Sequence, residues 1–256
     1  MTDNTVLNNS KAVRKSKVKK RSQLKSIWFR YKKNKLAMLG LVLLIILTLV
    51  SICAPLLANY NEDAIRQDMK NRLQFPNKDH IFGTDQYGRD LFARIIFGAR
   101  VSLSISLITI AVSLSIGIII GSVAGFYGGK IDDVLMRIMD VFLAIPQMLM
   151  AISIVAALGP GTGNLIAAMS ISNVPRFARI VRSSILTIKD QEFVEAAKAC
   201  GTRDGRIIAK HIVPNAIGPI IVQATLNIAE TIISISGLSF LGLGIKAPTP
   251  EWGSML

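Results

Sequence analysis

Four long stretches of the chain carry almost no charged side chains. They cover residues 36–60, 101–129, 141–175 and 212–245, and Glu230 is the only charged residue in any of them. About 20 apolar residues are enough for a helix to cross the hydrocarbon core of a bilayer. The pattern therefore predicts an all-α polytopic membrane protein.

Turn residues divide these stretches into five predicted spans. The spans cover residues 36–57, 102–126, 134–158, 164–180 and 214–237. The Gly- and Pro-rich segment 159–163 ends the third span, and Pro146 should kink it. We expect a tail at 1–35, a first transmembrane helix at 36–58, an external loop at 59–98 and a core at 99–256, with a cytoplasmic loop at 183–213.

Composition and charge narrow the class of protein. The 256 residues are 51% hydrophobic and only 18% charged, against about 25% charged in soluble domains. An ordinary soluble enzyme is therefore excluded, and two Cys are too few for a disulfide scaffold. The formal net charge of +14 would suit nucleic acid if the basic residues were spread over a globular surface.

The basic residues are instead concentrated before the first span. Residues 1–35 hold twelve Lys and Arg and one acid, Asp3. This asymmetry predicts a cytoplasmic N-terminus in a multi-pass cell-membrane protein, with anionic membrane lipid as an additional partner. Trp28, Phe29 and Tyr31 lie where an interfacial aromatic belt is expected, which argues against a nucleic-acid partner.

The loop at 183–213 has the pattern of two short helices. The first ends at Gly201 with a predicted left-handed cap, and Pro214 stops the second. Ala196 and Ala197 would permit close approach of another surface. A docking element and a plain amphipathic connector both fit this pattern.

The same loop resembles the EAA loop of permease subunits in ATP-binding-cassette importers. The resemblance rests on Glu195-Ala-Ala, Gly201 and the His211-Ile-Val-Pro214 corner, although the family usually has a branched aliphatic at His211 and Leu at Val213. It implies contact with an ATPase. The coupling residues implied are Glu195, Ala196, Ala197, Gly201, Asp204 and Arg206.

Two further motifs resemble the C-type permeases of dipeptide, oligopeptide and nickel importers. They are the segment 82–90 and the segments 238–244 and 248–253. A capped turn, with Asp85 and Asp90 accepting backbone hydrogen bonds, also fits the first motif. The external signature consists of Gly83, Thr84, Asp85, Gln86, Gly88, Arg89 and Asp90.

This resemblance implies a type I importer permease fold, also called MetI-like, in a bacterial or archaeal plasma or inner membrane. The implied partners are a second permease subunit in a heterodimer, two ATPase subunits and an external substrate-binding protein. The family has six core spans, so the last helix is expected beyond Leu256 and the chain looks truncated. Short peptides are the expected substrate, with nickel or a nickel complex as the alternative.

No catalytic, cofactor or metal site is predicted. The sequence lacks the phosphate-binding pattern G-x-x-x-x-G-K-[ST], so ATP hydrolysis is expected from partner subunits. Two Cys and two His, placed on opposite sides of the membrane, form no ligand cluster. Gly237-Leu238-Ser239 loosely resembles a hydrolase nucleophile turn, but no base lies near Ser239.

A polar stripe follows the fifth predicted span. Gln223, Asn227, Glu230 and Ser234 lie on one face of a helix. They either pack against neighbouring helices or line a substrate path, where Glu230 could meet a cationic group. Glu230 could also carry a proton in a secondary transporter, but an EAA loop would be useless there.

Two shorter patterns concern helix packing. Gly117, Gly121, Gly125 and Gly129 recur every four residues, which predicts close approach of another helix. Arg137 and Asp140, three residues apart, are expected to pair with each other.

Overall fold

The computed structural model describes residues 28–29 and 31–256. Most of the predicted tail at 1–35 lies outside the described residues. Within the described part every regular element is a helix, and the one β-bridge joins Thr84 to Asp90. The all-α prediction is thus confirmed.

The chain divides into two compact units, residues 1–48 and 49–256. Helix α2 (Lys35–Leu57) crosses this boundary and matches the first predicted span. Most of its side chains are exposed, as expected for a helix that faces lipid. Near its end, within the second unit, Ala54 is fully buried against Ala64 and Phe97.

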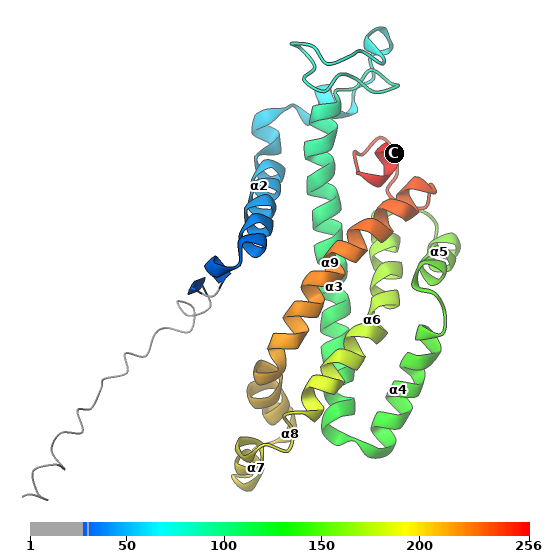
Figure 1. The fold of residues 1–256 in the computed structure, drawn as a ribbon. Helices are drawn as coiled ribbons and strands as arrows, with labels where there is room; N and C mark the ends of the chain where they lie inside the picture. The colour runs from blue at the N-terminus through cyan, green and yellow to red at the C-terminus, as the bar shows by residue number, and fades with distance from the viewer. Residues whose placement is uncertain (1–27, 30) are drawn as a thin grey trace, which may run out of the picture. The chain divides into compact units, whose positions relative to one another are not determined.

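The second unit contains the helices that form the bundle in Figure 1. They are α3 (Leu91–Tyr127), α4 (Gly129–Leu143), α5 (Gln147–Leu158), α6 (Thr162–Leu186), α7 (Glu192–Ala199), α8 (Asp204–Ile207) and α9 (Val213–Phe240). Before α3, the loop contains a π-helical turn, Tyr60–Ile65, and a 3-10 turn, Met69–Asn71.

Helix α3 begins at Leu91, well before the predicted start at residue 102. Asp90 caps it by accepting a 2.7 Å hydrogen bond from the Ala93 N–H. At 37 residues the helix is about 55 Å long, more than a bilayer core requires.

The third predicted span is broken rather than kinked. Helices α4 and α5 meet at an angle of 82° across the short connection at 144–146. Pro146 stands at this break, because it lacks the N–H that a continuous helix needs.

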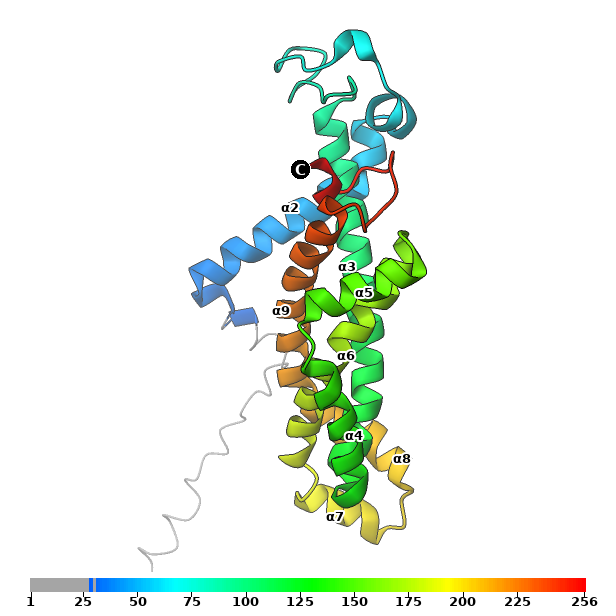
Figure 2. The same ribbon diagram turned by 90° about the vertical axis from the view of Figure 1, so that its right-hand side faces the viewer.

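Composition sets α6 apart from the other long helices. Three helical segments of the described chain are long and apolar enough to cross a membrane: Lys35–Leu57, Leu91–Tyr127 and Asp204–Phe240. The α4–α5 pair counts as a fourth candidate if the two bent helices together form one span. Helix α6, predicted as a span at 164–180, is not among them. It lies among α3, α4, α5 and α9 (Figure 2). Many of its side chains are buried.

The glycine repeat lies where α3 meets α6. A Cβ atom at Gly117 would stand 2.5 Å from the Phe177 Cβ, and one at Gly121 would stand 2.5 Å from the Ala178 carbonyl oxygen. Gly125 is nearly as close, with 3.1 Å to the Arg182 carbonyl oxygen. Close packing is confirmed for these three glycines, whereas Gly129 begins α4 and faces open space.

Candidate functional site

The loop between α6 and α9 is shorter than predicted, because α6 continues to Leu186. Helices α7 and α8 lie at the end of the bundle where α3 turns into α4 (Figure 1). Val194, Ile207 and Ile212 are fully buried and pack on α6 and α9 side chains such as Ile185 and Ile220. These contacts anchor the loop to the bundle.

The opposite face of this loop is open. Of the six predicted coupling residues, Glu195, Ala196, Gly201, Asp204 and Arg206 are exposed, and Ala197 is half-buried. Within the described part of the chain, the charged side chains among them form no ion pair. The loop therefore presents a polar face on a fixed apolar base.

Gly201 ends α7 with the predicted left-handed cap. Its φ is +70°, a conformation that costs a residue with a Cβ atom about 1–2 kcal/mol. The Gly201 N–H donates to the Lys198 carbonyl at 2.9 Å, and the Thr202 N–H donates to the Ala197 carbonyl at 3.1 Å. A Cβ at this position would meet nothing within 4 Å, so only backbone strain opposes a side chain here.

The polar stripe on α9 occupies two different environments. Asn227 is fully buried and accepts a 3.0 Å hydrogen bond from the Arg176 guanidinium of α6. Glu230 is exposed and forms an ion pair with the same guanidinium. Ser234 donates to the Glu230 carbonyl at 2.9 Å, and Gln223 is half-buried. Part of the stripe thus packs against α6 while Glu230 stays accessible.

Arg176 is the first of three arginines spaced three residues apart on α6. Arg179 pairs with Asp140 of α4, and Arg182 pairs with Asp132 near the start of α4. The predicted Arg137–Asp140 pair is therefore wrong, because Asp140 bonds to α6 instead of its own helix. The regular spacing of the three arginines is the signal in the sequence from which this charged interface could have been predicted.

The segment 82–90 is organised around Asp85. Its carboxylate accepts hydrogen bonds from the N–H groups of Tyr87 at 2.8 Å and Arg89 at 3.0 Å, and from the Arg89 guanidinium at 2.7 Å. Arg94 approaches it at 3.5 Å. This geometry confirms the capped turn, and Asp90 contributes the cap of α3.

Thr84, Gly83 and Gly88 of the external signature pack against the loop that precedes the turn. The Thr84 hydroxyl accepts a 2.9 Å bond from the Gln74 N–H and donates to the Asn71 carbonyl. Gly83 and Gly88 have φ of +74°, and a Cβ at Gly88 would stand 1.7 Å from the Asp68 oxygen. Gln86 alone among the seven is exposed.

Glu251, which lies inside the last motif, was not predicted as a site residue. Its carboxylate is fully buried and accepts 2.9 Å bonds from the N–H groups of Gly253 and Ser254. Ser102 of α3 also donates to it, at 3.3 Å. The group thereby holds the C-terminal segment against α3.

Among the described residues, the possible metal ligands and the two cysteines form no site. The described residues contain no group of three or more His, Cys, Asp or Glu able to hold a metal ion. Cys53 and Cys200 are both free thiols.

The geometry is that of a helical membrane subunit with an anchored loop at one end and a structured polar cap at the other. The sequence model of the family described as "Binding-protein-dependent transport system inner membrane component" matches residues 117–256. That of the "N-terminal TM domain of oligopeptide transport permease C" matches residues 22–76.

Individual relatives agree with these matches. The dipeptide transport system permease protein DppC of Alkalihalophilus pseudofirmus is 48% identical over 88% of this chain and 73% of its own length. The oligopeptide transport system permease protein OppC of Bacillus subtilis is 42% identical over 90% and 76%. The glutathione transport system permease protein GsiD of Shigella sonnei is 40% identical over 98% and 82%.

The fold also matches a solved transporter. In an inward-facing structure of the MetNI methionine ABC transporter, one chain aligns with 63% of this chain and 77% of its own length. The TM-score is 0.53 at 18% identity, which supports the MetI-like fold alone.

The chain belongs to the family of inner-membrane components of binding-protein-dependent transport systems. It is a multi-pass permease subunit of an ABC importer and not an enzyme itself. Such a subunit works with an ATPase and a substrate-binding protein. A secondary transporter and a hydrolase are therefore set aside.

Proposed function

We propose that this chain forms half of a translocation pathway for short peptides, as a heterodimer with a second permease subunit. The relatives described above are named for dipeptides, oligopeptides and glutathione, which favours peptides over the nickel alternative. Selectivity for individual peptides would then rest largely with the binding protein.

The loop of α7 and α8 is the proposed contact with one of two ATPase subunits. The observation that carries this proposal is its division into a buried apolar base and an exposed polar face. An element that couples the permease to an ATPase has to be anchored to the helix bundle and exposed toward the ATPase. This loop has both properties. Glu195, Ala196, Ala197, Gly201, Asp204 and Arg206 are the proposed contact and positioning residues.

The stripe on α9 is the proposed lining of the path. Glu230 is exposed although its helix is long and apolar enough to cross a membrane, and the charge of Arg176 balances its own. A balanced pair offers polar contacts without a net charge that would trap charged peptides. Gln223, Asn227 and Ser234 continue the same face of the helix.

Uptake by the reconstituted importer tests the substrate. In vesicles containing this chain, its permease partner, the ATPases and the binding protein, labelled di- and tripeptides should accumulate when ATP is supplied. The same peptides should stimulate ATP hydrolysis, whereas nickel should do neither. ATP-driven uptake of nickel without uptake of peptide would reject the peptide proposal.

Orientation is proposed from the charge asymmetry, with the N-terminus and the α7–α8 loop cytoplasmic and the signature segment 82–90 external. In a Cys53→Ala background, a Gln86→Cys variant should react with an impermeant thiol reagent on intact cells, because Gln86 is exposed. Native Cys200, also exposed, should react only after detergent solubilisation. Labelling of Cys200 on intact cells would reverse the orientation.

A further inference from the structure

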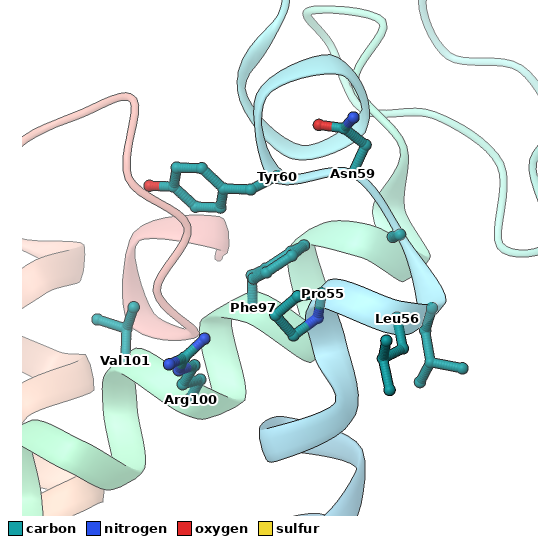
Figure 3. A pocket seen from close by; sticks show the side chains of 9 residues that line it. Pro55, Leu56, Asn59, Tyr60, Phe97, Arg100 and Val101 are labelled. Atoms are coloured by element: carbon teal, nitrogen blue, oxygen red, sulfur yellow. The ribbon is translucent and has the colours of Figure 1, made fainter.

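A cavity of about 760 Å³ lies between the end of α2 and the start of α3 (Figure 3). Pro55, Leu56 and Leu57 form its α2 wall, and Phe97 and Val101 form its α3 wall. Asn59, Tyr60 and Arg100 are the polar members of the lining. Nothing in the importer activity derived above uses this cavity.

The cavity is placed where both helices change from apolar to polar. The apolar stretch of α2 gives way to the polar loop at Asn59, and the uncharged stretch of α3 begins at Val101, directly after Arg100. In a membrane, this is the depth at which hydrocarbon gives way to headgroups. Asn59 and Tyr60 lie at the loop end of the cavity, and Arg100 lies on α3 beside Val101 (Figure 3).

Arg100 has no partner among the described residues. It is exposed, and no hydrogen bond or ion pair joins it to another described side chain or carbonyl. The nearby Arg94, by contrast, is buried and donates to the Ala64 carbonyl at 2.9 Å. A guanidinium left unpaired at headgroup depth is complementary to a phosphate.

Tyr60 adds a second hydrogen-bond donor to the lining of the cavity. Its ring packs edge-on against Phe97, with 5.1 Å between the ring centroids. In Figure 3 the Tyr60 and Arg100 side chains lie to the same side of Phe97, while Leu56 lies to the other. The contact with Phe97 holds the Tyr60 ring in the lining of the cavity.

We propose that this cavity binds an anionic phospholipid, with its phosphate on Arg100 and an acyl chain along Pro55, Leu56 and Val101. The apolar walls distinguish a lipid from a free anion, since a dissolved phosphate gains nothing from them. The site is separate from the basic tail, because it lies at the opposite end of the first transmembrane helix. The lipid would fill the space between α2 and α3 and brace their junction.

A photoreactive phosphatidylglycerol tests the site in the assembled importer in nanodiscs. The diazirine is carried on the acyl chain, and crosslinked peptides are mapped by mass spectrometry. Peptides containing residues 55–60 and 97–101 should be labelled. Arg100→Gln should reduce this labelling about fivefold, the effect expected for one basic side chain near a membrane surface.

Two further variants distinguish the effect of the Arg100 charge from an effect on the local structure. Arg100→Lys should recover much of the labelling. Arg66→Gln should leave it unchanged, because Arg66 lies in the loop before α3, outside the cavity lining, and pairs with Glu62 at 2.6 Å. Labelling unaffected by Arg100→Gln would overturn the proposal. Equal labelling by a diacylglycerol analogue would overturn the phosphate contact, and absent labelling of both peptides would overturn the lipid site as a whole.

Discussion

Gly201→Val should uncouple the importer without preventing its assembly. Valine at φ +70° is strained by about 1–3 kcal/mol, and the loop can relieve that strain only by shifting α8 relative to α7. Since about 1.4 kcal/mol corresponds to a factor of ten, this strain corresponds to a factor of about five to a hundred, and we expect at least about a fivefold loss of ATP hydrolysis stimulated by the loaded binding protein. Peptide uptake in proteoliposomes should fall in parallel.

Two variants in the same loop serve as controls for this result. Gly201→Asn should retain most activity, because Asn tolerates the left-handed conformation. Gly205→Val adds the same side chain at another exposed position with open space and no positive φ, so it should couple normally. Normal transport by Gly201→Val would show that this loop is not the coupling element.

Glu230→Gln should change which peptides are transported rather than whether the complex forms. Without the carboxylate, the charge of Arg176 stands unbalanced beside the proposed path. Two like charges about 8 Å apart repel by about 2 kcal/mol at an effective dielectric constant of 20, so uptake of lysine-containing peptides should fall at least about tenfold. Uptake of aspartate-containing peptides should fall much less, and basal ATP hydrolysis should persist.

The matched control removes both charges. Arg176→Gln combined with Glu230→Gln should return the ratio of cationic to anionic peptide uptake close to the wild-type ratio, because no net charge remains. An unchanged ratio in the single variant would contradict the path assignment. The stripe would then serve only in packing between α6 and α9.

Prediction from sequence succeeded where the signal was local. The first helix at 36–57, the turn capped by Asp85 and the left-handed end at Gly201 all depend on residues within a few positions of each other. The motifs at 82–90 and 195–201 were likewise recognisable because their turns require Gly at fixed places.

Failures arose where the outcome depended on distant neighbours. Asp140 was assigned to Arg137 on its own helix, but α6 brings Arg179 closer. Pro146 was expected to bend one helix, and the structure instead turns the chain by 82°. Residues 164–180 were predicted as a span from their lack of charge up to Pro175, but only the structure shows that α6 is surrounded by other helices, which bury many of its polar side chains.

The sequence by itself determined that this chain is a helical membrane subunit, that Gly201 ends a short helix with a left-handed cap and which loop carries the family motif, because hydropathy and turn chemistry act over short distances. Only the tertiary structure decided which charges pair across helices, that Glu230 is balanced by Arg176, and that Glu251 meets Ser102 of α3 and so holds the C-terminal segment. Those partners are separated by tens of residues along the chain. Helix packing alone sets the distances between them.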